Sequence, residues 1–299
     1  MTDTPVAEPK PHKKGWRLTL WILGVGTLLT LLGSWVLPWL EMLGEDRVAL
    51  VRIEGVIVDS KETVGELKRF GDSPAVKAIV LRIDSPGGGV VPAQEIYEAV
   101  RRLRTRTNKA VVASMGTVAA SGGYYIAVAS DRIMANPGTL TGSIGVIMET
   151  ANLEGLLKKI GVEGVVIKSG RFKDVGSPLR KMTDEERTVL QTVMDDVHQQ
   201  FIEAVSEGRS LDLADVHELA DGRVFTGRQA KDMKLVDELG DLDDAIQLAA
   251  DLAGIEGEPQ VVEPRKRFSI RELIESKLSG ALPQFDWHPG VSLKYLMAY

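Results

Sequence analysis

Strongly apolar runs alternate with helix-like patterns along the first half of the chain, and this alternation limits the possible folds. Residues 48–58 form a β-branched run, and Ala78–Ile83 is a continuous apolar run with a single arginine. Residues 61–70 and 93–104 have the spacing of helices, the second with apolar residues on one face. A continuous apolar run is typical of a strand that is covered on both faces. Strand–helix–strand units of this length predict an α/β fold with a mainly parallel sheet.

The stretch Gly116–Tyr125 (GTVAASGGYY) places one serine among small residues, directly after a predicted strand over residues 110–115. The apolar residues after it predict a buried helix. Ser121 would then stand at a helix start, where backbone N–H groups are unpaired and the helix dipole is positive. That position suits a serine that must carry an oxyanion, although the same pattern fits an N-cap or a close-packed serine. The stretch around Ser121 does not match the Gly-x-Ser-x-Gly motif of the hydrolases, because Ala119 occupies the position of the first glycine.

Residues 18–40 carry no charged side chain, in a chain of which 26% is charged. At about 1.5 Å per residue, a helix over this segment would span a hydrocarbon core of roughly 30 Å. Four of the five tryptophans lie near its two ends, as an aromatic belt requires. We expect a retained single-pass transmembrane anchor rather than a cleaved signal peptide, because the apolar region is long and no small-x-small cleavage site comes after it.

Basic residues precede this segment and acidic residues come after it, so the positive-inside rule places residues 1–17 in the cytoplasm and the rest of the chain outside. The net charge of −6 gives no indication of nucleic acid as a partner. The sequence contains no cysteine, which excludes a disulfide framework, a thiol nucleophile and a cysteine-based metal site.

A serine nucleophile needs a positioned base. The histidines do not lie in glycine-rich turns at strand ends, which argues against a Ser-His-Asp triad. No two of them have the i, i+3 or i, i+4 spacing of a metal site. They are found in the cytoplasmic tail, in a long polar helix, in an acidic segment and in a proline-rich tail: His12, His198, His217 and His288.

A lysine is the remaining candidate, although an ammonium group becomes a base only when burial lowers its pKa by several units. Lys168 and Lys173 both lie in residues 168–178, a segment without clear periodicity. This segment comes after a predicted helix over 153–160 and a predicted strand over 165–167. The residue pattern alone does not distinguish the two lysines, and either also fits an ordinary solvated loop lysine.

The last part of the chain contains a clear helix start and then changes character. Thr183 and Glu186 form a capping-box pattern ahead of a long predicted helix that runs to about residue 207. Residues 256–299 are interrupted by prolines, with a predicted helix at 270–278 and an apolar end, Val291–Tyr299. We expect this end to dock on its own domain, or else on a neighbouring subunit or in an active-site groove.

Several motifs, taken together, resemble the bacterial signal peptide peptidase A family of membrane-anchored serine proteases. They occur in family order and spacing, and the similarity covers roughly residues 48–253. The chain is most similar to the short, single-domain form of the family. The motifs are residues 84–88 (DSPGG), 119–125 (AASGGYY), 141–145 (TGSIG), 170–173 (GRFK) and 222–230 (GRVFTGRQA).

The resemblance implies a Clp-protease/crotonase-like α/β fold, a Ser/Lys dyad, no metal or other cofactor, and a homo-oligomer. Carried over to this sequence, Ser121 is the nucleophile and Lys173 the general base. Ser143 would hydrogen-bond to the lysine amine, although a Thr-Gly-Ser turn also has a purely structural explanation. The backbone N–H groups of Gly88 and Gly122 would form the oxyanion hole, a role that suits a glycine-rich turn at a strand end.

The expected organisation is a cytoplasmic tail over 1–17, a transmembrane anchor over 18–40, a serine peptidase domain over 41–255 and a C-terminal extension over 256–299. The expected function is a serine endopeptidase of the inner (plasma) membrane, with its catalytic domain in the periplasm or otherwise outside the cytoplasm. Its substrates would be residual signal peptides and similar apolar peptides.

Three alternatives remain. The first is a related protease that acts on membrane-protein fragments or other periplasmic substrates. The second is an inactive scaffold of the same fold that binds apolar peptides, although a scaffold has no need of both the serine and the lysine. The third is an acyl-CoA enzyme, for which we find no basic signature that would bind the CoA phosphates.

Overall fold

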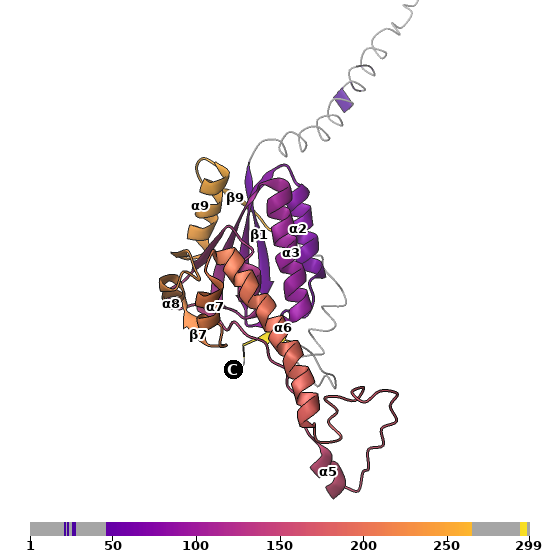
Figure 1. Cartoon of the computed structure of the whole chain (residues 1–299). Coiled ribbons are helices and arrows are strands. Elements are labelled where there is room, and N and C mark those ends of the chain that lie inside the picture. The colour runs from indigo at the N-terminus through magenta and orange to yellow at the C-terminus, as the bar shows by residue number, and fades with distance from the viewer. Residues whose placement is uncertain (1–20, 22, 24–25, 28–45, 265–293, 298–299) are drawn as a thin grey trace, which may run out of the picture. The chain divides into compact units, whose positions relative to one another are not determined.

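The computed structural model describes residues 21, 23, 26–27, 46–264 and 294–297. The chain divides into two units, Met1–Glu45 and Asp46–Tyr299, and the second unit holds the sheet and its helices (Figure 1). Among the described residues, no helix is long and apolar enough to cross a membrane. Most of the predicted anchor and all of the predicted helix at 270–278 lie outside the described residues, so both stay predictions.

A mainly parallel sheet forms the centre of the second unit, as the alternating apolar runs predict. Its middle consists of β1 (Arg47–Glu54), β2 (Val76–Ser85) and β4 (Ala110–Ala120), all parallel. Among the described residues the strand order is β7-β6-β4-β2-β1-β9, and β5 and β8 extend the sheet from β4; β7 is antiparallel to β6. The shorter strands are β5 (Arg132–Ala135), β6 (Leu140–Gly142), β7 (Val224–Thr226), β8 (Glu238–Leu239) and β9 (Gln260–Val262).

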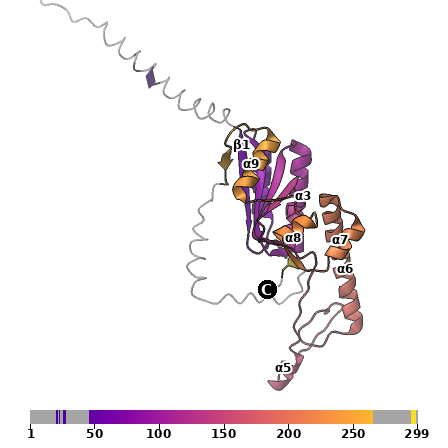
Figure 2. The ribbon, with the colours of Figure 1, turned by 90° about the vertical axis from the view of Figure 1, so that its left-hand side faces the viewer.

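Helices cover both faces of this sheet (Figures 1 and 2). On one face lies α9 (Leu242–Ala253), and on the other lie α2 (Lys61–Asp72), α3 (Val90–Thr107), α4 (Gly122–Ala127) and α6 (Asp184–Arg209). Val48 and Leu50 of β1 join the core under α9, whereas Ala49 and Val51 join the larger core on the other face. Both faces of the strand are therefore apolar, which explains its continuous apolar sequence. The remaining helices are α5 (Glu154–Lys159), α7 (Leu213–Leu219) and α8 (Gly227–Asp232).

The capping box at the head of α6 is confirmed. The Glu186 backbone N–H donates to Thr183 Oγ1 at 3.2 Å, and the Thr183 N–H donates to Glu186 Oε2 at 2.9 Å. The helix begins at Asp184, one residue after its cap. The capping pair therefore determines where the helix starts, as the sequence pattern predicts.

Two other local predictions are wrong in part. The strand expected at 165–167 is absent, and these residues lie in an irregular segment in which Ile167 is 96% exposed. A β-branched run becomes a strand only where it packs against neighbouring strands, and this run has none. In addition, β4 continues to Ala120 rather than ending near residue 115, because Ala119 pairs with Ser85 on one side and with Thr141 on the other.

Replacing Gly208 of α6 by alanine should destabilise the protein by about 1–3 kcal/mol, because overpacking forces the backbone to shift. The added Cβ atom would lie 2.2 Å from the Val128 carbonyl oxygen. The matched control is Gly155→Ala in α5, where nothing lies within 4 Å of the added atom. The control should be neutral or stabilising by up to about 1 kcal/mol. Urea unfolding followed by circular dichroism measures both, and equal effects would contradict the prediction.

Candidate active site

Ser121 lies on the sharp turn between β4 and α4, where the sequence places it. Its backbone has φ 53° and ψ −117°, in the region where residues other than glycine are strained. Such strain costs on the order of 1–3 kcal/mol and is concentrated at functional sites. The side chain is fully buried, and its Oγ atom has no hydrogen-bond partner among the described residues. A strained serine on a strand-to-helix turn is an arrangement that presents a nucleophile.

The glycine-rich strand β3 (Gly87–Gly89) forms the wall opposite the serine turn. Gly87 has φ 103°, and a Cβ atom on Gly88 would lie 2.1 Å from the Ile57 carbonyl oxygen, so both positions require glycine. A Cβ atom on Gly122 would lie 3.3 Å from the Gly88 nitrogen. The backbones of Gly88 and Gly122 therefore lie in contact, as two N–H groups that bind one oxyanion must.

The C-terminal strand β10 (Lys294–Leu296), drawn in yellow in Figure 1, lies in the groove beside these glycines. It pairs antiparallel with β3, and Tyr295 stands opposite Gly88 in the register. On its other side, Lys294 exchanges backbone hydrogen bonds of 3.1 and 3.3 Å with Ile147. The tail is thus held as an extended peptide between two backbone segments, the way β-strand addition binds peptides.

The carbonyl oxygen of Tyr295 lies close to the predicted oxyanion hole. The position that a Cβ atom on Gly87 would take is 2.1 Å from this oxygen and 2.8 Å from the Gly122 nitrogen. The carbonyl oxygen of Tyr295 and the backbone nitrogen of Gly122 therefore border the same small space. The described residues of the apolar C-terminus, 294–297, therefore lie in the groove beside Ser121. An active-site groove is one of the placements that the sequence suggests for this segment.

The side chain of Tyr295 fills a buried aromatic pocket. Its ring stacks on Tyr125 with a centroid distance of 5.2 Å and lies 4.8 Å from the ring of Phe201. Its hydroxyl donates to the Val197 carbonyl at 3.1 Å. Burial raises the pKa of Tyr125 to about 12 and also raises the pKa of Tyr295, so both phenols are neutral at physiological pH. The pocket therefore accepts a large, mostly apolar side chain that carries one hydrogen-bond donor.

Ser143 lies beside the serine turn, and its predicted hydrogen bond to the lysine amine stays a prediction. Ser143 comes directly after β6, in which Gly142 accepts a 2.8 Å hydrogen bond from the Ser121 backbone N–H. Ser143 is 8% exposed and lines a hollow of about 730 Å³ that the tail residues Leu296 and Met297 also border. Ser143 therefore lies close to the end of the peptide groove.

The two candidate lysines are not brought to Ser121 within one chain. Lys173 is exposed in the segment between α5 and α6, and no hydrogen bond or ion pair in the described part of the chain involves its amine. The amine of Lys168 forms an ion pair with Asp174 and donates to the Arg171 carbonyl at 2.9 Å. Because Lys168 is held by a carboxylate, the structure favours Lys173 as the available amine.

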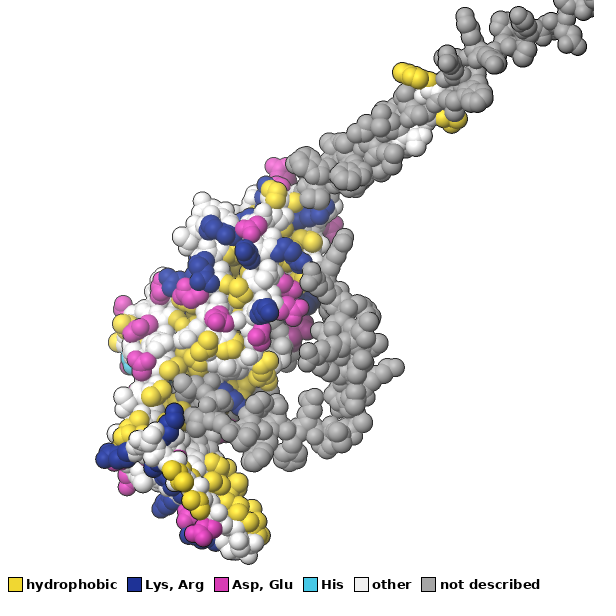
Figure 3. Space-filling model, turned by 90° about the vertical axis from the view of Figure 1, so that its right-hand side faces the viewer, with side chains coloured by type: hydrophobic (Ala, Val, Ile, Leu, Met, Phe, Trp, Pro, Cys, Tyr) yellow, Lys and Arg dark blue, Asp and Glu magenta, His cyan; other side chains and the backbone are white. Residues whose placement is uncertain are grey.

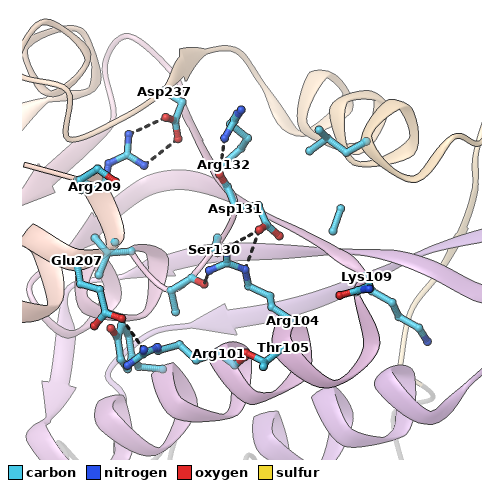
Figure 4. Close-up of a pocket in the computed structure, with 18 residues that line it drawn as sticks. Arg101, Arg104, Thr105, Lys109, Ser130, Asp131, Arg132, Glu207, Arg209 and Asp237 are labelled. Atoms are coloured by element: carbon cyan, nitrogen blue, oxygen red, sulfur yellow. Dashed lines mark hydrogen bonds and ion pairs between the residues drawn. The ribbon is translucent and has the colours of Figure 1, made fainter.

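A second hollow, of about 900 Å³, lies at the opposite end of β4 from Ser121 (Figure 4). Each carboxylate that lines it is paired with an arginine, and these pairs connect α3, α6, the turn before β5 and the turn before β8. The pairs are Arg101–Glu207, Arg104–Asp131 and Arg209–Asp237. Lys109 and Arg132, the other two cations of the lining, donate to backbone carbonyls, so this hollow is best explained as a structural network.

Two family models match the chain. The model of peptidase family S49 matches residues 104–256, and the Clp protease model matches residues 51–140. The first range contains Ser121, Ser143 and Lys173, and the second contains Gly88 and Ser121. The mixed α/β sheet fits a Clp-protease-like fold.

The chain is also similar to curated proteins. A candidate protease of Synechocystis sp., slr0021, is 46% identical over 218 residues, which cover 73% of this chain and 77% of that protein. A protein of Enterococcus faecium named as a candidate signal peptide peptidase SppA is 37% identical over 67% of this chain and 62% of its own length. Protease 4 of Salmonella typhi is 34% identical over 79% of this chain. The match spans 62% of the Enterococcus protein and 41% of the Salmonella protein, so the chain covers less than two thirds of the length of each of these two relatives.

Deleting residues 291–299 should open the groove beside Ser121. A fluorophosphonate probe should label this serine faster, and the apparent KM for a short peptide should fall, because the tail no longer competes for the groove. Tyr295→Ala should act in the same direction, since it removes the fully buried ring. Lys294→Ala, at an exposed side chain, is the control. A lower melting temperature with unchanged labelling and KM would mean that the tail merely docks on the surface.

Proposed function

Because this chain belongs to peptidase family S49 and is a protease, we propose that it is a serine endopeptidase with a Ser/Lys dyad. The observation that carries this proposal is the bound tail. A peptide lies extended beside the strained Ser121, with a carbonyl oxygen next to the Gly122 nitrogen. An arrangement that holds a peptide in this way is suited to attack on its backbone.

The chemistry depends on the groups around that carbonyl. Ser121 Oγ attacks the carbonyl carbon, while the Lys173 amine takes the hydroxyl proton and later gives it to the leaving amine. The N–H groups of Gly88 and Gly122 stabilise the oxyanion of the tetrahedral intermediate. Ser143 holds the lysine amine in place. Water then hydrolyses the acyl-enzyme, and none of these steps needs a metal or other cofactor.

We propose that Lys173 reaches the Ser121 of a second copy of the chain. Ser121 is fully buried and Lys173 is exposed, and the segment between α5 and α6 projects from the sheet (Figures 1 and 2). A lysine acts as a general base when it is desolvated, which a second copy would achieve by covering it. The site is therefore incomplete in one copy, and a homo-oligomer completes it.

Exposed apolar side chains on the same segment support this assembly (Figure 3). Val165 is 80% exposed and Ile167 is 96% exposed. Apolar surface of this extent on one segment is typical of a protein–protein contact. The other members of the group, all at least one third exposed, are Leu156, Ile160, Val162, Val166 and Leu179.

The proposed substrates are residual signal peptides and similar apolar peptides outside the cytoplasm. The groove binds a peptide through its backbone, which depends little on sequence, and through an aromatic pocket that favours a large apolar side chain. The anchor predicted at residues 18–40 would hold the enzyme at the inner membrane, where such peptides are released. Fragments of membrane proteins have the same apolar chemistry and are the alternative substrates.

Ser121→Ala and Lys173→Ala should each abolish peptide hydrolysis, and mixing the two inactive proteins should restore part of it. Each mixed assembly contains sites in which an intact serine meets an intact lysine from another copy. Random mixing of equal amounts restores up to about one quarter of the sites, and hydrolysis of a fluorogenic peptide measures the recovery.

Control variants distinguish a dyad shared between two copies from a dyad within one chain and from a different base. Lys168→Ala should keep much of its activity, because its amine is committed to Asp174 and Arg180 still holds that carboxylate when Lys168 is removed. If both single variants are inactive and the mixture stays inactive, serine and lysine act within one chain. If Lys173→Ala keeps most of its activity, the dyad itself is wrong.

The proposed topology is tested separately in intact spheroplasts. Residues before Trp16 should resist an externally added protease, because a cytoplasmic tail is covered by the membrane. A tag placed after Tyr299 should be digested. Immunoblotting of both ends gives the result, and the opposite pattern would place the catalytic domain in the cytoplasm.

A further inference from the structure

A network of charged side chains holds the segment that carries Lys173. At its centre is Asp174, the residue directly after the lysine, whose side chain is 10% exposed. One oxygen of this carboxylate pairs with the Lys168 amine, and the other accepts a 2.8 Å hydrogen bond from Arg180 Nε. Both carboxylate oxygens are therefore occupied.

Arg180 connects this carboxylate to the start of α6. Its two Nη atoms bond to the two oxygens of Glu186, at 2.8 Å for the Nη1–Oε2 pair. The Glu186 side chain is 6% exposed and also closes the capping box with Thr183. Paired N–H···O bonds of this kind fix the orientation of both partners. A single guanidinium thus joins the residue beside Lys173 to the first turn of a long helix.

The two carboxylates stay ionised wherever a lysine base would work. The hydrogen bonds from Arg180 are the main cause that lowers the pKa of Glu186 to about 2. Those from Arg180 and Lys168 hold the pKa of Asp174 well below its usual range. The network is therefore intact from mildly acidic pH upward.

Apolar packing does little to hold this part of the chain. Residues 161–171 are all exposed, and the backbone around Lys173 is shaped by short turns, including a 3.1 Å hydrogen bond from the Lys173 N–H to the Gly170 carbonyl. Exposed ion pairs contribute little to stability, but here both carboxylates are nearly buried and share one arginine. Polar contacts, this network and the exposed ion pair of Arg171 with Glu185, are therefore the main restraints on where the lysine stands.

We propose that Arg180 is a positioning residue for catalysis, which clamps Asp174 to Glu186 and so presents Lys173 at a fixed place relative to α6. The same helix lines the peptide groove, where its Val197 carbonyl and Phe201 ring contact Tyr295. Each copy thus holds on one helix both its own groove and the base that it offers to a second copy. This inference rests on the proposed function, because it needs Lys173 to be the base.

The test compares Arg180→Ala and Arg180→Lys with Arg187→Ala in the full-length, membrane-inserted protein. Arg180→Ala should lower kcat by about 10- to 100-fold with KM changed less than about twofold, because a displacement of about 1 Å can cost a hundredfold in rate. Arg180→Lys should recover part of kcat, since an ammonium group reaches one carboxylate but not both. Arg187 is an exposed arginine near the start of α6, directly after Glu186, and its removal should leave kcat unchanged.

A second comparison shows whether Arg180 acts through the lysine. Adding Arg180→Ala to Lys173→Ala should not lower the residual rate further. Asp174→Asn, which keeps the side-chain shape but loses the charge, should reproduce the kcat loss if Arg180→Ala fails to fold. The inference is overturned if both variants keep wild-type kcat, or if they change KM alone. It is also overturned if Arg187→Ala loses as much activity as Arg180→Ala.

The outcome also separates this inference from the proposed function. If Lys173→Ala is active, the Ser/Lys dyad fails and the positioning role fails with it. If Lys173→Ala is inactive while Arg180→Ala is fully active, the dyad stands and the positioning role alone is rejected.

Discussion

Contact between the backbones of Gly88 and Gly122 is the constraint on which the site depends. The parallel pairing of β2 and β4 brings the carboxyl ends of both strands to one edge of the sheet, so the chain segments after these strands meet there. A side chain on Gly88 would collide with the Ile57 carbonyl, and one on Gly87 would collide with the tail. Glycine at these positions allows a peptide backbone to approach the serine turn closely.

The parts of the site that the sequence predicts are those determined locally. Ser121, Gly88 and Gly122 each stand in a run of small residues near a strand end, and the family resemblance supplies the roles that this pattern alone leaves open. The strained φ of Ser121 is not readable from the sequence, because it results from pairing of β4 with β6 on one side and the start of α4 on the other. The strand predicted at 165–167 fails for the opposite reason, since a β-branched run needs a partner strand and the described part of the chain places none beside it.

The occupied groove explains why one site can bind peptides of varied sequence. Backbone pairing of β10 with β3 and Ile147 involves no side-chain discrimination, so selection depends on the aromatic pocket around Tyr295. The tail belongs to the same chain, and tethering gives it a high effective concentration at the groove. Under the proposed function, a substrate must therefore displace a peptide that is already bound, and strongly apolar peptides with a large side chain at the matching position should compete best.

Assembly and catalysis become connected through the segment between α5 and α6. Ordering such a segment at the moment of association would cost conformational free energy, which weakens binding. The network of Arg180 with Asp174 and Glu186 orders it beforehand, while its apolar side chains remain exposed for contact. Under the proposed function, an isolated copy then has a buried serine without a base and an exposed lysine without a serine. On this proposal neither half hydrolyses peptides alone, so the oligomer would be the active species and the surrounding proteins would be protected from single copies.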